Sequence, residues 1–272
     1  MLHELIACGA RVAPRGAETL EVVASGFTLD NPRSRILVNP VRRWSAALAV
    51  GEFAWHVSGS DDVEPLAYYA PIWRQFSGDG AHIRGSCYGK RIFDPGAASL
   101  SQWEALVELL RSDPESRRAI LSVQQAPAEA LDIASPDVPC VTTCQFLIRD
   151  GRLDAIVHMR SNDAIWGLPY DVFLFTMIQE MLSLELGVPL GRYHHFAGSL
   201  HLYERHFALA RRILANPHGG GEMPPMTDVG RLRAFVAAER SLRGGGAHAQ
   251  ELSPYWSELL APIVAFAAKR TA

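Results

Sequence analysis

The sequence predicts an α/β (α+β) fold in which helices pack against a β-sheet, because segments with strand character alternate with segments of helical periodicity. Three segments are apolar and rich in β-branched residues: 18–29, 119–123 and 141–159. Three others repeat their apolar residues at the spacing of a helix: 41–57, 100–110 and 172–186. With 272 residues, 48% of them hydrophobic, the chain is long enough to bury a large core, and we expect a single domain over residues 1–272.

The N-terminal part of the chain predicts a strand followed by an apolar helix. The strand over 18–29 follows Arg15-Gly16, a turn-like dipeptide whose arginine is able to face an anion. The helix over 41–57 carries a single acid, Glu52. Glu52 is either a solvent-facing residue or a buried carboxyl with a raised pKa, fit for proton transfer, and the spacing leaves both interpretations open.

Charge and cysteine content exclude several classes of protein. The net charge of −3 provides no general basic field for nucleic acid, so an anion has to be bound locally. The four cysteines form no CxxC pair and no metal-ligand spacing, so we expect free thiols, a reducing cytoplasm and no metal. The apolar run at the N-terminus is too short for a signal peptide, and no stretch reaches the roughly 18 to 20 apolar residues of a membrane-spanning helix.

The most informative stretch is 139–171. Within it, alternating apolar residues on both sides of Asp150-Gly151 predict a β-hairpin with a type I′ turn. Cys140 stands at the mouth of the first strand and, on the residues alone, is either a buried structural cysteine or a nucleophile. We interpret the four residues after the second strand as a dense polar turn that binds a ligand. The turn consists of Arg160, Ser161, Asn162 and Asp163.

Three further groups of residues are candidates for binding. The segment 65–88 predicts short helical pieces and loops that carry Trp73 and Tyr88, either as packing or as a stacking surface. Arg117-Arg118 precedes a strand and is either an exposed basic pair or a pair suited to bidentate phosphate binding. His201 and Tyr203 are two residues apart, so on an extended backbone they point the same way.

Serine, proline and glycine residues predict where the helices begin and end. Serines precede the helix at 100–110 and are available to cap it, and Gly187 ends the apolar helix at 172–186, for which Pro169 marks the start. Two more segments have helical spacing: 206–214 and 229–242. We expect the glycine-rich breaks at 219–221 and 244–246 to be surface loops.

Eight motifs, in the same order, make the chain resemble the thymidylate synthase superfamily from about Arg15 to about Phe207. They are a helix with Glu52, Ile72-Trp73, Tyr88-Gly89, the DPESRR of 113–118, Pro139-Cys140, the RSND of 160–163, Gly167 and the GSLHLY of 198–203. Within the superfamily, RSND and GSLH are more similar to the deoxycytidylate and cytidylate hydroxymethylases. The resemblance implies a thymidylate synthase-like fold, a large mixed β-sheet packed with helices, with one sheet face forming a homodimer interface.

The resemblance also implies a role for each candidate residue. Cys140 is the catalytic nucleophile, adding as thiolate to C6 of a pyrimidine, and we expect nearby Arg160 to help lower its pKa. Glu52 is the catalytic carboxylate that organises water and moves protons. The substrate-binding residues are Arg15, Arg160 and Ser161 for the phosphate, Arg117 and Arg118 for the phosphate from the second subunit, His201 and Tyr203 for the sugar 3′-hydroxyl, and Asn162. The folate-binding residues are Asp163 for the pterin ring, with Trp73, Tyr88 and Gly167 around it.

Asp171 is the third catalytic residue and the one that bears on the base. The thymidylate synthases have at this position an asparagine that reads uracil, whereas the hydroxymethylases have aspartate. Cytosine presents an amino donor at N4 and an acceptor at N3, so a carboxyl that accepts from N4 and shares one proton with N3 matches it. Against uracil O4 the carboxylate places acceptor on acceptor, which costs about 1–3 kcal/mol for a buried group.

The expected reaction is 5-hydroxymethylation of dCMP or CMP with 5,10-methylenetetrahydrofolate and water. Val141 and Met159 stand where the synthases usually have histidine and glutamine, and the ending AFAAKRTA lacks the apolar closing tail of the synthases. Both departures favour hydration of the exocyclic methylene over its reduction. The alternative is methylation of dUMP, as in thymidylate synthase. A catalytically silent nucleotide-binding protein is a third interpretation, which intact Cys140, Glu52 and Asp163 disfavour.

Overall fold

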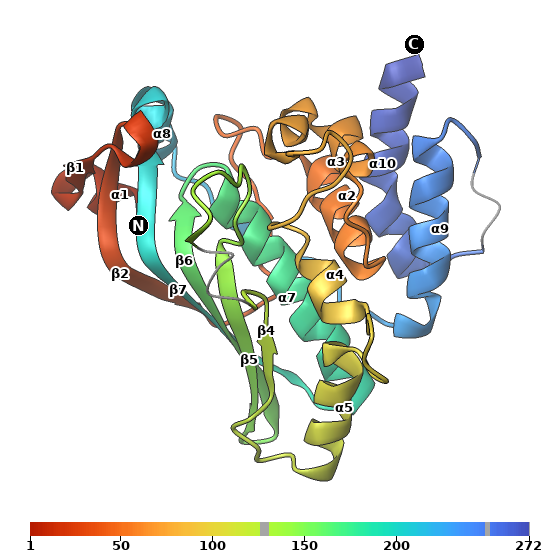
Figure 1. The fold of residues 1–272 in the computed structure, drawn as a ribbon. Coiled ribbons are helices and arrows are strands. Elements are labelled where there is room, and N and C mark those ends of the chain that lie inside the picture. Colours follow the sequence, from red (N-terminus) through yellow and green to blue (C-terminus); the bar gives the residue numbers. More distant parts are fainter. Residues whose placement is uncertain (126–130, 248–250, 272) are drawn as a thin grey trace.

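The computed structural model describes residues 1–125, 131–247 and 251–271, which form a six-stranded mixed sheet with helices packed on one side (Figure 1). The strands lie in the order β1-β2-β7-β6-β5-β4; β6 and β7 are parallel and the other neighbours are antiparallel. Their bounds are Ala10–Val12 (β1), Thr19–Leu29 (β2), Ile120–Ser122 (β4), Val141–Arg149 (β5), Arg152–Asp163 (β6) and Leu190–Tyr203 (β7). The predicted mixed sheet packed with helices is confirmed.

The central hairpin forms as its turn residues predict. Asp150 and Gly151 have φ values of 49° and 68°, the positive values that a type I′ turn requires at both central positions. The strand β6, however, continues through the four polar residues to Asp163, so the predicted polar turn is wrong. Its backbone stays extended because β7 runs parallel beside it, with Ser161 opposite Ser199 and Asp163 opposite His201.

The three predicted main helices are present with shifted starts. The helix α2 spans Ala46–Val57 and begins after Ser45, whose Oγ accepts a hydrogen bond from Leu48 N, so the predicted first turn from residue 41 is not helical. In α5, Gln102–Ser112, Ser101 and Glu104 form a capping box, as the serines predict. The helix α7, Gly167–Leu186, begins before Pro169 and ends at Gly187, which is left-handed with φ 68°.

Shorter elements complete the chain. They are α1 (Leu2–Cys8), η1 (Pro14–Gly16), β3 (Ile36–Leu37), α3 (Val63–Tyr69), η2 (Pro71–Phe76), α4 (Tyr88–Phe93), η3 (Glu204–His206), α8 (Phe207–Ala215), β8 (Gly220–Gly221), η4 (Val229–Arg231), α9 (Leu232–Arg243) and α10 (Pro254–Thr271). The expected loop at 219–221 is partly wrong, because Gly220 and Gly221 pair with β3 in a two-stranded sheet.

The core lies between the sheet and α7, and it extends through α2 to α9 and α10, which Figure 1 shows on the same side of the sheet. Alternate residues of β6, Ala155, Val157 and Met159, are buried in it. On the far helices, the buried rings of Phe53, Phe235 and Trp256 pack together. Within the described residues, no helix is both long and apolar enough to cross a membrane.

Candidate active site

Cys140 lies immediately before β5, on a segment that side chains hold from two directions. Asp137 accepts hydrogen bonds from Gly85 N at 2.8 Å and Ser86 N at 2.7 Å, which ties the segment to the loop before α4. Arg160 of β6 donates to the carbonyl oxygens of residues 138 and 139 and places Nη2 3.9 Å from the Cys140 sulfur. The thiol is therefore fixed in position beside a guanidinium.

The thiol nevertheless resists ionisation in the isolated chain. Burial raises the pKa of Cys140 to about 11, although Arg160 and Arg15 act to lower the pKa. Arg160 thus lowers the pKa as expected, but the loss of solvent outweighs its charge, so the pKa lies above its ordinary value. Asp171 and Asp137 act in the same direction as burial.

Two carboxyls from different helices meet near this thiol. Burial, followed by the charge of Asp171, raises the pKa of Glu52 on α2 to about 8. Burial also raises the pKa of Asp171 on α7 to about 7, while a 2.7 Å hydrogen bond from Asn162 Nδ2 opposes the rise. Glu52 is partly buried and its pKa is raised, so it is not an ordinary solvent-facing acid, and its role in proton transfer stays a prediction.

Tyr88, at the start of α4, belongs to the same cluster. Its ring stacks on His56 of α2 at 5.3 Å between centroids, and burial followed by the charges of Cys140 and Asp171 raises its pKa well above the usual value. Glycine is required next to it, because a Cβ on Gly89 would lie 1.8 Å from the carbonyl oxygen of His56. The two helices thus meet closely enough to bring Tyr88 and Glu52 to one site.

Sequence reasoning missed two residues that reach Asp171 through Asn162. His195 Nε2 lies 3.0 Å from Asn162 Oδ1, and Tyr193 Oη lies 2.9 Å from His195 Nδ1. Tyr193 and His195 are both fully buried on β7, and Asn162 on β6 is almost fully buried. The only signal in the sequence is that a tyrosine and a histidine occupy alternate positions of the strand that otherwise hold apolar residues.

The turn between β6 and α7 places a second group of polar residues. Asp163 Oδ1 accepts hydrogen bonds from Ile165 N at 2.7 Å and Trp166 N at 3.2 Å. Arg42, which sequence reasoning also missed, is buried over the Trp166 ring and donates through Nε to the carbonyl oxygen of Ile165. Within the described residues its Nη1 and Nη2 are fully buried and have no hydrogen-bond partner, and the guanidinium lies over the rings of Trp166 and Tyr170.

His201 and Tyr203 lie side by side on β7, as predicted, with ring centroids 5.0 Å apart. His201 Nδ1 lies 3.5 Å from Ser161 Oγ, so the predicted sugar and phosphate residues adjoin each other. Arg15, in η1, has a left-handed backbone with φ 52° and lies near enough to Cys140 to affect its pKa.

Three predicted residues lie outside this cluster. Arg117 and Arg118 precede β4 and are exposed; β4 pairs Ile120 with Gln145, five residues and roughly 17 Å along β5 from Cys140. Trp73 packs instead in a separate small cluster against Trp55. The roles of these three residues, like those of the other site residues, stay predictions.

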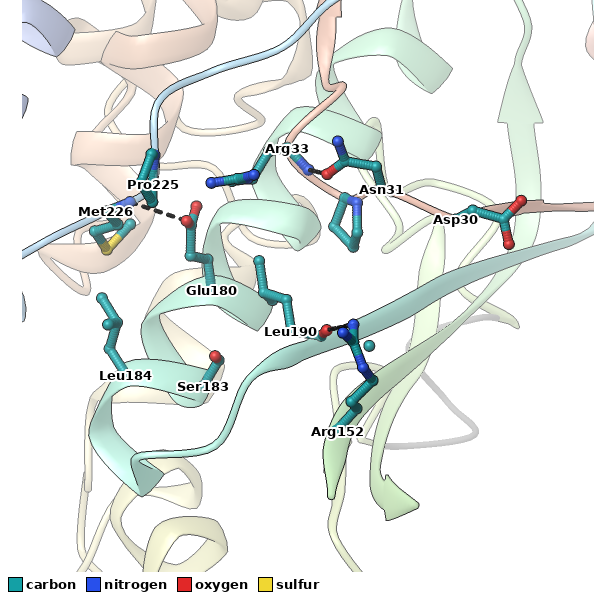
Figure 2. A pocket seen from close by; sticks show the side chains of 12 residues that line it. Asp30, Asn31, Arg33, Arg152, Glu180, Ser183, Leu184, Leu190, Pro225 and Met226 are labelled. Atoms are coloured by element: carbon teal, nitrogen blue, oxygen red, sulfur yellow. Dashed lines mark hydrogen bonds between the residues drawn. The ribbon is translucent and has the colours of Figure 1, made fainter. Parts of the chain in front are cut away.

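Two other features of the surface lie apart from the cluster. A pocket of about 480 Å³ opens between α7 and the first residues of β6 and β7, where Figure 2 shows Arg152, Leu190 and Glu180. It is at the opposite end of β6 from Asp163, roughly 35 Å away along the strand, and no predicted site residue lines it. Among the described residues, Asp61, Asp62 and His82 form the one group with metal-ligand spacing, but Lys90 already pairs with Asp61 at 2.7 Å.

The fold and the cluster together describe an α/β protein with a half-buried cysteine, two carboxyls of raised pKa and arginines close to the thiol. The thymidylate synthase family model matches residues 1–227. Deoxyuridylate hydroxymethyltransferase of Bacillus phage SP01 is 30% identical over 216 residues, covering 75% of this chain and 55% of the phage enzyme. Thymidylate synthase 1 of Bacillus subtilis (strain 168) is 30% identical over 193 residues, covering 70% of this chain and 68% of that enzyme.

A solved structure has the same architecture. Thermostable thymidylate synthase A from Bacillus subtilis superposes with a TM-score of 0.69 at 25% identity, over 83% of this chain and 86% of the other. The chain belongs to the thymidylate synthase family and is a one-carbon transferase of that family.

Proposed function

We propose that the enzyme transfers a one-carbon unit from 5,10-methylenetetrahydrofolate to C5 of dCMP or CMP and adds water to it, yielding the 5-hydroxymethyl nucleotide. The observation that carries the proposal is the carboxyl of Asp171, held in the catalytic cluster at the position where the synthases have an asparagine. Its pKa of about 7 makes both the charged and the neutral form accessible near neutral pH. A carboxyl able to share a proton matches the N3 and N4 edge of cytosine.

In the proposed mechanism, Cys140 opens the reaction and later closes it. Its thiolate adds to C6, so that electron density builds at C5 and forms a bond to the methylene carbon of the folate. Loss of the C5 proton and cleavage of the carbon–nitrogen bond release tetrahydrofolate and leave an exocyclic methylene. Water adds to that methylene, and departure of the Cys140 sulfur from C6 restores the aromatic ring.

Glu52 and Asp171 have different roles in the proposed mechanism. Glu52, whose pKa of about 8 suits proton exchange near neutral pH, orients water and carries protons at the base. Asp171 holds the base edge and stabilises charge on it as the adduct forms. Asp163 and Gly167 are on the side where the folate is expected. The family roles of Trp73 and Tyr88 at the folate rings stay predictions, because Trp73 packs in a separate cluster and Tyr88 is stacked on His56.

Hydration rather than reduction is supported by the residues next to Cys140. Val141 and Met159 pair across β5 and β6 and are both buried. These apolar residues replace the histidine and glutamine that the synthases usually have. This departure from the synthase pattern supports an enzyme whose last step adds water to the exocyclic methylene.

We further propose a homodimer in the cytoplasm. Arg117 and Arg118 lie too far along the sheet from Cys140 to bind the phosphate of their own site, which supports their acting in the site of a second copy, beside Arg15 and Arg160. The four cysteines are free thiols, in keeping with a reducing compartment.

A tritium-release assay tests the proposal. The enzyme is incubated with 5-tritiated dCMP, CMP or dUMP and the folate, and the product is examined by mass spectrometry. We expect release from a cytidine nucleotide, a product that has gained one CH2O group, and no dihydrofolate. Comparing dCMP with CMP establishes the preferred sugar, and Cys140→Ala is expected to abolish release.

The second candidate is one-carbon transfer to dUMP, which the name of the phage relative favours. Methylation of dUMP would produce dihydrofolate, visible as a rise in absorbance, whereas hydroxymethylation of dUMP would not. Tritium release from dUMP alone would overturn the assignment of cytosine.

A further inference from the structure

A continuous chain of buried hydrogen bonds runs from β7 to the carboxyl of Asp171. It passes from the Tyr193 hydroxyl to His195, from His195 to the Asn162 amide, and from that amide to Asp171 Oδ2, over distances of 2.9, 3.0 and 2.7 Å. We refer to Tyr193, His195 and Asn162 as the relay. The relay lies behind Asp171, and its members come from two neighbouring parallel strands.

The direction of donation along the relay follows from which groups hold protons. Burial raises the pKa of Tyr193 well above its usual value and lowers the pKa of His195 to about 4, so the phenol keeps its proton and the imidazole is neutral. A neutral imidazole has one N–H, and because Asn162 Nδ2 donates to Asp171, the amide presents its acceptor oxygen to Nε2, which must therefore carry the N–H. The phenol then donates to the unprotonated Nδ1. With Tyr193 donating to Nδ1, the single N–H of His195 is on Nε2 and donates to Asn162 Oδ1.

The amide of Asn162 is held at both ends. Its oxygen accepts from His195, and its nitrogen donates to Asp171 Oδ2. The ring of His195 is also stacked on Phe27 at 5.2 Å between centroids, which opposes a ring flip that would exchange the two nitrogens. The Asn162 amide is thus unable to turn without breaking two buried hydrogen bonds.

The consequence for Asp171 is that its two oxygens are not equivalent. Oδ2 is held as an acceptor, so a proton on this carboxyl sits on Oδ1. Cytosine and uracil present opposite donor and acceptor patterns at positions 3 and 4, and a neutral carboxyl free to move its proton between oxygens would match both. We propose that the relay makes Asp171 read one base only, so that Tyr193 and His195 are positioning residues for base selectivity.

The close packing around the pair supports this assignment. A Cβ at position 167 would lie 3.2 Å from Asn162 Nδ2 and 3.4 Å from Asp171 Oδ2, so Gly167 leaves just enough space for their hydrogen bond. The inference rests on the proposed function for the identity of the preferred base. It does not depend on that function for the existence of a preference.

The test compares kcat/KM for the cytidine and uridine monophosphates of the sugar that the wild-type enzyme prefers. Tyr193→Phe removes only the first donor of the relay and is expected to reduce the ratio of the two values about fivefold to tenfold, the effect of one lost hydrogen bond. Tyr255→Phe is the matched control, since it removes a buried hydroxyl that contacts Met177 sulfur at 3.6 Å, away from the relay.

His195→Phe is a second variant, which keeps an aromatic ring against Phe27 and removes both ring nitrogens. A parallel fall for both nucleotides, with the ratio unchanged in Tyr193→Phe and His195→Phe, would indicate a structural role only and overturn the inference. A wild-type preference for the uridine nucleotide would overturn the proposed function instead. The relay would then be supported if the variants weaken that preference and overturned if they do not.

Discussion

Replacing Asp171 with asparagine is the most direct perturbation of base choice. The side chain keeps its shape, and the carbonyl of an asparagine at this position is able to accept the hydrogen bond that Asn162 Nδ2 now donates to Oδ2. The variant is therefore expected to fold. To match uracil, the new amide has to turn so that its nitrogen faces O4 and its oxygen faces N3–H, which gives up the hydrogen bond from Asn162 Nδ2 when the nucleotide binds.

The magnitude follows from the cost of an unmatched buried polar group. With wild-type enzyme, the carboxylate faces uracil O4 as acceptor against acceptor, at a cost of about 1–3 kcal/mol. Removing that repulsion is expected to raise kcat/KM for dUMP about 5-fold to 150-fold, since 1.4 kcal/mol corresponds to a factor of ten. The same change is expected to lower kcat/KM for the cytidine nucleotide by a factor in that range.

Tritium release from C5 measures both values in one assay, and the thermal midpoint of the variant controls for its folding. A variant that loses activity toward the cytidine nucleotide without gaining any toward dUMP would show that Asp171 supports catalysis but does not select the base. Equal activity of wild-type enzyme and variant on both nucleotides would refute a role for Asp171 at the base edge altogether.

Three further predictions follow from buried ionisable groups. Glu52 has a pKa of about 8 in the folded protein, so it binds its proton more tightly there than in the unfolded chain, and it lowers the free energy of unfolding progressively from about pH 4.5 to pH 8. In urea denaturation, the difference in this free energy between pH 5 and pH 9 should therefore be smaller for Glu52→Gln than for the wild-type enzyme. Alkylation of Cys140 by iodoacetamide should still accelerate between pH 8 and pH 10, and Arg160→Gln should slow it by removing the nearest positive charge. Glu180→Ala leaves Arg35 charged and buried without its partner, and should cost about 3–5 kcal/mol in urea denaturation.

Each of these predictions has a matched control. Glu64→Ala breaks an exposed pair with Arg74 and should leave the denaturation midpoint unchanged, in contrast to Glu180→Ala. Cys8 is exposed, so its alkylation rate serves as the reference for an accessible thiol. The phase that disappears in Cys140→Ala is assigned to Cys140. A wild-type stability that is independent of pH above 5, or a Cys140 reaction that reaches its plateau below pH 8, would contradict the raised pKa values.

Local rules predict the parts of the fold that local chemistry decides. The hairpin turn at Asp150-Gly151, the serine cap of α5 and the left-handed glycine after α7 each depend on a few adjacent residues, and each is confirmed. The motifs also assign Cys140, Glu52 and Asp171 to one catalytic site. The structure places Asp171 near enough to both Cys140 and Glu52 for its charge to raise their pKa values, although the three residues come from a loop and two different helices.

Non-local pairing decides what local rules do not. The polar residues 160–163 have the composition of a turn, and only β7, which lies some 40 residues further along the chain, keeps them in a strand. In the sequence, Tyr193 and His195 also look like ordinary residues of a strand, because nothing nearby in the chain marks them as a pair. Their function depends on Asn162 lying beside them, and sequence periodicity does not specify that neighbour.

The cluster around Cys140 consists of groups that are hard to charge, and this bears on how the reaction begins. The pKa values of about 11 for the Cys140 thiol and about 7 for Asp171 imply that moving the thiol proton to that carboxylate costs roughly 5 kcal/mol. A turnover of about 10 per second corresponds to a barrier of about 16 kcal/mol, so this cost leaves about two thirds of the barrier for the chemistry. In the proposed mechanism the thiol therefore need not be ionised in the resting enzyme, because a proton transfer of this cost fits within the barrier of turnover.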